Sequence, residues 1–381
     1  MRRILSMIKI KVILALFCLL LISLLPTWAV GLEYKVTGLG LGGTQSFAWA
    51  INDSGQVFIL QDEAIYLYDK GNYTNISALY NIGSGYYGVS CFGINNSGQI
   101  VTNDSNGHAL LLSGGVKTDL GTYGGILSLA LGINNSGQVV GEYWDSSWDT
   151  YAFLYSEGQM KDLGLGPSSG ASSINELGII TGWYVPQDSY SYQAFLYNNG
   201  VMSNISPFGS QQSLGYDINN SGQVVGEFLT TDNSAIHAFL YSHGEITDLG
   251  VLSGSYSVAL ALNEMGEVVG SSTALVGIEI KIVCNERENE CHEVEVPVYQ
   301  DHGFIYEKGE MIDLNNLIPQ NSGWFLSWAY DINNKGQIVG VGFYNGEQRG
   351  FLLTPVPKRS TRDLGLKRKL SRWIKISIAK E

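Results

Sequence analysis

The hydrophobic and polar positions of this chain repeat as a unit. An apolar segment ends at Ile-Asn, a short polar turn with Ser-Gly follows, and a second apolar segment of the type Gln-Val-Val-Gly begins directly after it. A turn rich in Asn and Gly between two apolar runs is typical of a β-hairpin, so each copy predicts two antiparallel strands. The copies begin at Ile51, Ile94, Ile133, Ile174, Ile218, Leu262 and Ile332.

A second signature follows about ten residues after each clear copy. It reads Ala-Phe-Leu-Tyr and a Gly-containing turn, as in His237 to Gly244, and a short segment such as Glu245 to Gly250 completes the unit. We name the four predicted strands a, b, c and d. Four strands in about 43 residues are typical of one blade of a β-propeller. Seven units therefore predict an all-β, seven-bladed β-propeller of four-stranded blades.

The two ends of the repeat region predict how the ring closes. The last unit stops after strand c, Gly350 to Thr354, and no strand d follows it. Residues Tyr34 to Gly40 align with Gly244 to Gly250, a strand d, and precede the first strand a. Completing the last blade with the N-terminal strand removes two exposed sheet edges. We therefore predict one propeller domain over residues 33–357.

Composition and charge narrow the possible partners. The 381 residues are 45% hydrophobic and 15% charged with 47 Gly, which excludes a disordered or coiled-coil protein. Nine basic and 33 acidic residues lie between positions 30 and 357, a net charge of −24. Such a surface repels phosphate backbones, so we expect no nucleic-acid partner.

The two ends of the chain differ from this acidic body. Residues 1–29 combine four basic residues with an uncharged run from Val12 to Leu25, the pattern of a signal peptide. The alternative, a membrane anchor, is disfavoured because 14 apolar residues span about 21 Å, less than a hydrocarbon core of about 30 Å. We expect a secreted or periplasmic monomer without an integral membrane span after cleavage. The basic tail, 358–381, either binds an anionic membrane or cell-wall polymer or is held loosely by the body.

The repeated motifs resemble a known family. The unit Ile-Asn-Asn-Ser-Gly-Gln-Val-Val-Gly, followed by His-Ala-Phe-Leu-Tyr and Thr-Asp-Leu-Gly, is similar to the extracellular repeats called the HAF family. His237 to Phe239 reproduces the tripeptide that gives the family its name. The resemblance covers nearly the whole mature chain and implies a secreted bacterial repeat protein. It brings no established activity and no catalytic residues.

The periodic polar residues predict structural roles. His108, His237 and His302 open strand c in three different blades, so they lie too far apart to share a metal ion. The Asn-x-Ser-Gly turns lack the alternating acidic positions of a calcium loop, and we interpret them as hairpin turns. One position of strand d is Asp or Asn in six blades, and we expect its side chain to form hydrogen bonds with the backbone of the adjacent turn. These residues are Asn75, Asp119, Asp162, Asn204, Asp248 and Asp313. We expect no metal, no cofactor and no catalytic residues at these motifs.

The loops between strands b and c vary from blade to blade, and variable loops on a repeated scaffold are where binding usually occurs. The third and fourth of these b-to-c loops are rich in aromatic residues beside acidic ones, a combination that suits sugar rings. Packing of the same rings at the blade edges is the alternative. The predicted binding residues are Trp144, Trp148, Trp183, Tyr184, Tyr190 and Tyr192, with Glu142, Asp145, Asp149 and Asp188 nearby.

The sixth b-to-c segment is a long insertion. Alternating apolar and polar residues on both sides of a polar centre predict a projecting hairpin. In an exported protein Cys284 and Cys291 are expected to form a disulfide across it. A metal site made of the two Cys and His292 is the alternative, and it needs further ligands.

Two functions remain open on the sequence alone. The first is an extracellular recognition module that binds a glycan or cell-surface polymer through the aromatic loops. The second is a glycan-cleaving propeller enzyme with carboxylates near the central channel. Asp217 and Asp331 are its candidate carboxylates because equivalent positions in other blades are Ala, Gly or Ser. No third acid or Arg cluster accompanies them, so we favour binding over catalysis.

Overall fold

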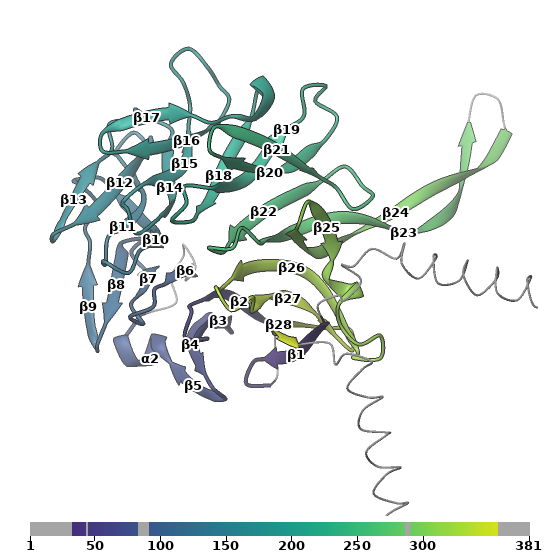
Figure 1. The fold of residues 1–381 in the computed structure, drawn as a ribbon, viewed down its shortest axis with the longest axis horizontal. Helices are drawn as coiled ribbons and strands as arrows, with labels where there is room; N and C mark the ends of the chain where they lie inside the picture. The colour runs from purple at the N-terminus through teal and green to yellow at the C-terminus, as the bar shows by residue number, and fades with distance from the viewer. Residues whose placement is uncertain (1–32, 43–44, 83–90, 286–289, 357–381) are drawn as a thin grey trace, which may run out of the picture. The chain divides into compact units, whose positions relative to one another are not determined.

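The protein is described by a computed structural model that covers residues 33–42, 45–82, 91–285 and 290–356. The predicted signal peptide and the predicted basic tail lie outside the described residues. Seven four-stranded antiparallel sheets follow one another around a ring, which confirms the predicted seven-bladed propeller (Figure 1). Short helical segments lie at two d-to-a connections and at the end of the first blade: η1 (Pro207–Gly209), η2 (Leu314–Asn316) and α2 (Ile76–Tyr80).

Each of the first six blades uses its strands in chain order from the channel outward. The first three blades consist of β2 (Ser46–Ile51), β3 (Val57–Gln61), β4 (Ala64–Asp69) and β5 (Asn72–Asn75); β6 (Cys91–Ile94), β7 (Ile100–Asn103), β8 (Ala109–Ser113) and β9 (Val116–Asp119); and β10 (Leu127–Ile133), β11 (Val139–Trp144), β12 (Thr150–Ser156) and β13 (Gln159–Asp162). The next three consist of β14 (Ser169–Ile174), β15 (Ile180–Tyr184), β16 (Gln193–Asn198) and β17 (Val201–Asn204); β18 (Ser213–Ile218), β19 (Val224–Leu229), β20 (Ile236–Ser242) and β21 (Glu245–Gly250); and β22 (Ser257–Leu262), β23 (Val268–Asn285), β24 (Glu290–Glu307) and β25 (Glu310–Asp313).

The seventh blade joins the two ends of the repeat region. Its strand order is β1 (Glu33–Leu39), β28 (Glu347–Val356), β27 (Ile338–Tyr344) and β26 (Trp324–Ile332). Strand β1 therefore supplies the missing strand d, as the alignment of Tyr34 to Gly40 predicted. The ring is closed by pairing segments from opposite ends of the chain, so the outer edge of β28 and the inner edge of β1 are both paired.

In the third to seventh blades, the motif residues Gly and Phe form one cross-strand pair. In the third blade Gly141 of β11 lies opposite Phe153 of β12. A Cβ on Gly141 would stand 2.9 Å from the Phe153 ring and 1.9 Å from the Leu129 carbonyl oxygen of the neighbouring strand, so only glycine fits there. The Phe ring is fully buried between blades, and the same is true of Phe195, Phe239, Phe304 and Phe351. The core thus consists of layers between successive blades.

The insertion in the sixth blade forms the predicted hairpin. Strands β23 and β24 pair far beyond the other strands of their sheet and project from the ring (Figure 1). Their backbones place Cys284 directly opposite Cys291. Directly opposed residues of antiparallel strands have Cβ separations near those of a disulfide. The pairing is compatible with the predicted disulfide, which stays a prediction.

Candidate functional site

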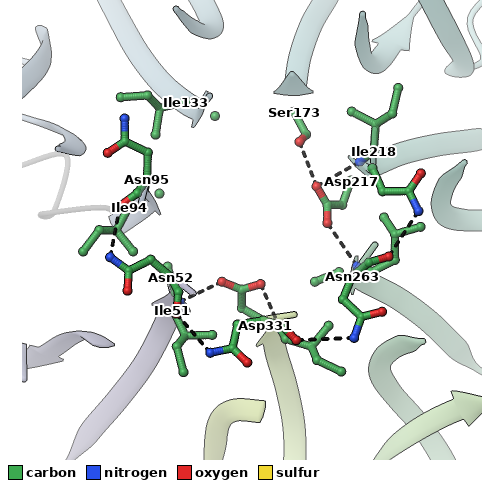
Figure 2. Close-up of a pocket in the computed structure, with 18 of the residues that line it drawn as sticks. Ile51, Asn52, Ile94, Asn95, Ile133, Ser173, Asp217, Ile218, Asn263 and Asp331 are labelled. Atoms are coloured by element: carbon green, nitrogen blue, oxygen red, sulfur yellow. Dashed lines mark hydrogen bonds between the residues drawn. The ribbon is translucent and has the colours of Figure 1, made fainter. Parts of the chain in front are cut away.

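The first Asn of each a-to-b turn ties its blade to the next one. Its side-chain Nδ2 donates a hydrogen bond to the backbone carbonyl of the equivalent Asn in the following blade, at 3.0 to 3.3 Å. The seventh amide, of Asn333, returns to Asn52 and closes the ring (Figure 2). We call these residues the asparagine ring: Asn52, Asn95, Asn134, Asn175, Asn219, Asn263 and Asn333. The predicted hairpin turns are present, but the sequence did not predict their role between blades.

The next residue of each turn forms a second, exposed ring. Its backbone N–H donates to the side-chain oxygen of the equivalent residue one blade on, at 2.7 to 3.3 Å. Burial raises the pKa of Asp53 in this ring, but hydrogen bonds from Asn334 and Asn96 outweigh that effect and lower it overall. The rim of the channel therefore carries carboxylates that already accept hydrogen bonds from the neighbouring blade.

A cavity of about 300 Å³ occupies the centre of the ring. Residues of the asparagine ring and of the second ring line it, together with Trp49, Tyr216 and Tyr330. Trp49 stacks on Tyr330 with ring centroids 4.2 Å apart. Among the described residues, the buried indole N–H of Trp49 has no hydrogen-bond partner. The lining thus combines polar turn residues with aromatic side chains.

Asp217 and Asp331 both lie on the channel wall, as the sequence predicted (Figure 2). A β-bulge just before the last residue of strand a turns each of them toward the channel. Asp217 accepts hydrogen bonds from Ser173 Oγ at 2.8 Å and from Leu262 N at 3.0 Å, and so connects three blades. Asp331 accepts from Ile51 N at 2.7 Å and connects the last blade to the first. Both carboxylates hold blades together.

Burial sets the protonation of these groups. Desolvation raises the pKa of Asp331 to about 7, with repulsion from the Asp217 and Asp53 carboxylates in the same direction. Burial raises the pKa of Asp217 as well. A carboxyl whose pKa is raised by folding keeps a proton that the unfolded chain has released. The folded state is therefore favoured at low pH and loses stability as the pH rises from about 4 toward 7.

We expect Asp331→Ala to reduce the pH dependence of stability. Alanine is the residue found in the same slot at Ala50 and Ala261. One pKa unit corresponds to about 1.4 kcal/mol, so between pH 5 and pH 8 the native protein should lose roughly 2 kcal/mol more stability than the variant. Chemical denaturation at both pH values measures this difference. Parallel losses in the two proteins would contradict the assignment of the raised pKa to Asp331.

The histidines that open strand c bond within their own blades. His108, His237 and His302 each place Nδ1 2.7 to 2.9 Å from the carboxylate of the strand d Asp eleven residues later. These Asp residues also accept a backbone N–H two residues further on, as predicted for that slot. Within the part of the chain that the structure describes, no group of three His, Cys, Asp or Glu could hold a metal ion.

The predicted aromatic residues of the third and fourth blades divide into exposed and packed rings. Trp148 is 62% exposed, Tyr190 is fully exposed and Tyr192 is exposed at the edge of Trp183, with ring centroids 5.1 Å apart. Trp144 and Trp183 are half-buried. Tyr184 is 8% exposed and packs in the core between the third and fourth blades. Alternation along β15 explains why Trp183 and Tyr184 lie on opposite faces.

One acidic residue joins these two blades. Glu142 Oε2 of the third blade and Trp183 Nε1 of the fourth both come within 3 Å of where a Cβ on Gly170 would stand, at 2.6 and 2.8 Å. Glycine at this position makes room for both groups. Burial raises the pKa of Glu142 to about 7. A carboxyl and an indole thus lie on the same glycine beside the fourth b-to-c loop.

The loop that carries Trp148 is a rigid Asx turn. Asp145 Oδ1 accepts hydrogen bonds from Ser147 N at 2.8 Å and Asp149 N at 3.1 Å. Backbone bonds from Asp145 N to Asp149 O and from Trp148 N to Asp145 O complete the turn. Trp148 takes the left-handed conformation within it, with φ at +67°.

The second blade contains the same turn with glycine in that place. Asp104 Oδ1 accepts from Asn106 N and His108 N at 2.9 Å, and Gly107 N bonds to Asp104 O. Gly107 has φ at +78°, close to the value of Trp148. A left-handed conformation costs a non-glycine residue roughly 1 to 2 kcal/mol. The turn itself therefore favours glycine, and its geometry gives no reason for a tryptophan.

Comparison with known proteins identifies the fold and no family. No protein-family model and no curated protein sequence matches the chain. The extracellular domain of a candidate one component system from B. thetaiotaomicron gives a TM-score of 0.50 at 10% identity, covering 84% of this chain and 40% of that one. A protein assigned as TolB from Agrobacterium tumefaciens gives 0.42 at 12% identity, covering 58% of this chain and 89% of that one. The first likeness supports the propeller fold, and membership of the HAF family stays a prediction.

The structure also bears on the predicted absence of a membrane span. None of the helices among the described residues is long and apolar enough to cross a bilayer.

Proposed function

We propose that this protein is an extracellular recognition module that binds a carbohydrate or a similarly flat polar ligand through the b-to-c loops of the third and fourth blades. The proposed surface consists of Trp148, Trp183, Tyr190 and Tyr192, with Trp144 beside it. Tyr184 is left out because it is buried in the core. Secretion through the predicted signal peptide is part of the proposal.

The conformation and exposure of Trp148 are the main support for this proposal. It stands in a backbone conformation that disfavours it, on a turn that uses glycine one blade earlier, and it remains 62% exposed. Folding gains little from a ring in that position. A large rigid ring, held out by a preorganised turn, is however the kind of residue that dominates binding energy at protein interfaces.

The surroundings of the exposed rings suit a sugar. Asp145 and Asp149 flank Trp148 and offer acceptors for hydroxyl groups. Trp183 and Tyr192 meet edge to face, with an interplanar angle of 88°, so they present two differently oriented walls. Glu142 beside Trp183 holds its proton up to about pH 7 and is able to donate or accept a hydrogen bond there. Flat rings next to acceptors stack on the C–H faces of sugars while the hydroxyls are bound.

The experiment is a glycan-array screen of the mature protein, followed by titration of the hits with Trp148→Gly. We expect the variant to bind at least about thirtyfold more weakly, the equivalent of 2 kcal/mol lost at a binding hot spot. Its melting temperature should be unchanged or higher, because glycine adopts the left-handed conformation without strain.

Phe208→Gly is the matched control for this experiment. Phe208 is also an exposed aromatic residue in the left-handed region, with φ at +51° and 55% exposure, but it lies outside the proposed surface. Its replacement should leave glycan affinity unchanged. Normal binding by Trp148→Gly, or an array without any carbohydrate ligand, would contradict the proposed function.

A further inference from the structure

A second cavity, of about 690 Å³, lies in the seventh blade between β1, β28 and the start of β26. Trp324 and Tyr344 form one part of its lining, with ring centroids 5.2 Å apart and an interplanar angle of 34°. Lys35, Gly38 and Arg349 form another. Aromatic and cationic side chains therefore face one space that is separate from the loops of the third and fourth blades.

The seventh blade departs from the repeat at this place. In the second, fifth and sixth blades, the His that opens strand c bonds the Asp of strand d at 2.7 to 2.9 Å. Arg349 takes the place of the His in the seventh blade, and Gly38 takes the place of the Asp. Burial supports the alignment of Gly38 with Asp248, because the residues that follow them, Leu39 and Leu249, are both buried. The blade has gained a guanidinium and lost the carboxylate of its own strand d.

Glycine at position 38 also shapes the cavity. A Cβ there would stand 3.0 Å from Cζ2 of Trp324, so the missing side chain lets the indole lie against β1. The glycine thus leaves a space where the second, fifth and sixth blades hold a carboxylate. The indole of Trp324 lies beside that space. Such a combination of a concave wall, an aromatic face and a few placed polar groups is typical of small-ligand sites.

The charges around the cavity favour an anionic ligand. Arg349 is the one arginine among the described residues, and its side chain is only 17% exposed. It bonds Glu347 at 2.6 Å, a residue that is 69% exposed on the hairpin tip between β27 and β28. The planar guanidinium matches a carboxylate in shape and charge, and Lys35 adds a second cation. These cations stand out in a body with a net charge of −24.

We infer that this cavity binds a sugar carboxylate, as in a uronic acid unit. The ligand's carboxylate takes the place of the strand d Asp beside Arg349, where it competes with the exposed Glu347. The sugar ring lies against Trp324 and Tyr344. This site is independent of the surface around Trp148, so either one is able to fail without the other.

The test compares trigalacturonate with its neutral methyl ester by titration calorimetry on the mature protein. We expect the acid to bind at least about tenfold more tightly than the ester, because a charge-assisted hydrogen bond pair is lost in the ester. Arg349→Gln should weaken binding of the acid by a similar factor. Glu347→Gln should strengthen it, by about threefold or more, because a competing carboxylate is removed. Trp148→Gly should bind the acid as the native protein does.

Gly38→Asp supplies a further variant, since it returns the carboxylate of the other blades and should abolish binding of the acid. The melting temperature of Gly38→Asp shows whether the new side chain fits beside the indole of Trp324. If the variant does not fold, Arg349→Gln and Glu347→Gln test the inference without it. Equal affinity for acid and ester, no binding of the acid, or weaker binding by Glu347→Gln would each overturn the inference. Loss of binding in Trp148→Gly would place the uronate on the other surface and overturn it as well.

Discussion

Replacing Asn219 with alanine is expected to lower the free energy of unfolding by about 3 kcal/mol, which makes it one of the most damaging single substitutions in the chain. Asn219 is 3% exposed and makes four hydrogen bonds. Its Nδ2 donates to Gln223 Oε1 at 2.8 Å and to Asn263 O at 3.1 Å, while its Oδ1 accepts from Ser221 N and Gln223 N. Alanine leaves the buried carbonyl of Asn263, the half-buried Gln223 and the backbone N–H of Ser221 without these bonds.

The cost should be larger than that of an ordinary turn residue because one of the bonds joins two blades. Asn220→Ala is the matched control. Asn220 is exposed in the second ring, where it accepts from Glu176 N at 2.8 Å and donates to Glu264 at 2.7 Å. Water replaces such bonds, so this variant should lose about 1 kcal/mol or less. Chemical denaturation of both proteins tests the difference, and equal losses would show that the asparagine ring contributes nothing beyond its turns.

Asn219→Asp tests the contribution of the Nδ2 donor alone, because the size and shape of the side chain stay nearly the same. Aspartate keeps the volume and the two accepted backbone bonds, but it turns a carboxylate oxygen toward Gln223 Oε1 and Asn263 O. A buried carbonyl and a half-buried amide oxygen would then face an anion. We expect a loss of stability at neutral pH at least as large as that of the alanine variant, and a smaller loss at acid pH, where the carboxyl regains a proton.

The architecture followed from the sequence because every level of the repeat agreed with it. The turn, the Val-Val-Gly strand and the Ala-Phe-Leu-Tyr strand recur together, and Tyr34 to Gly40 matched the strand that the last unit lacked. Each of these signals is local or lies within one unit. The number of units then fixed the number of blades, since each unit buries its faces against its neighbours.

The links between blades could not be derived from one unit. The hairpin interpretation explains why Asn, Ser and Gly occur in the a-to-b turn, but not why its first position is Asn in all seven copies. The sequence did contain a sign of a separate role for this Asn. In the fourth turn Asn175 is kept, although the two residues after it are Glu and Leu instead of Asn and Ser. A donor that reaches a carbonyl about 40 residues away is visible only once the blades are placed.

The candidate site was accessible from the sequence only in part. Loop composition indicated the third and fourth blades, but Tyr184 follows Trp183 directly, and the alternation of the strand buries one of the two. The bulges that turn Asp217 and Asp331 into the channel leave no mark in composition. The left-handed conformation of Trp148 became meaningful only when the turn at Gly107 was seen to be the same.

Deleting β1 is expected to have the largest effect on the fold. The strand pairs with β28 and completes the seventh blade, so its loss exposes a full strand edge with its unpaired N–H and C=O groups. It also uncovers apolar surface, because Leu39 packs with Ala48 and Val57 of the first blade. We expect a mature protein that lacks residues 30–40 to aggregate, or to melt at least about 10 °C lower, the shift that several kcal/mol produce in a domain of this size.

A control deletion and a rescue make this prediction specific. Removing residues 358–381 takes away more chain but no strand of the ring, and should leave the melting temperature within a few degrees of the native value. A synthetic peptide of residues 30–40, added to the truncated protein, should restore solubility and raise the melting temperature in proportion to its concentration, because it binds the folded ring and not the unfolded chain. If the truncated protein melts like the native one, or if the peptide has no effect on it, closure by β1 does not stabilise the propeller. The ring is then held by the bonds of Asn333 and Asn334 to the first a-to-b turn, by the Asp331 bond to Ile51 and by the packing of β26 and β27 against β2.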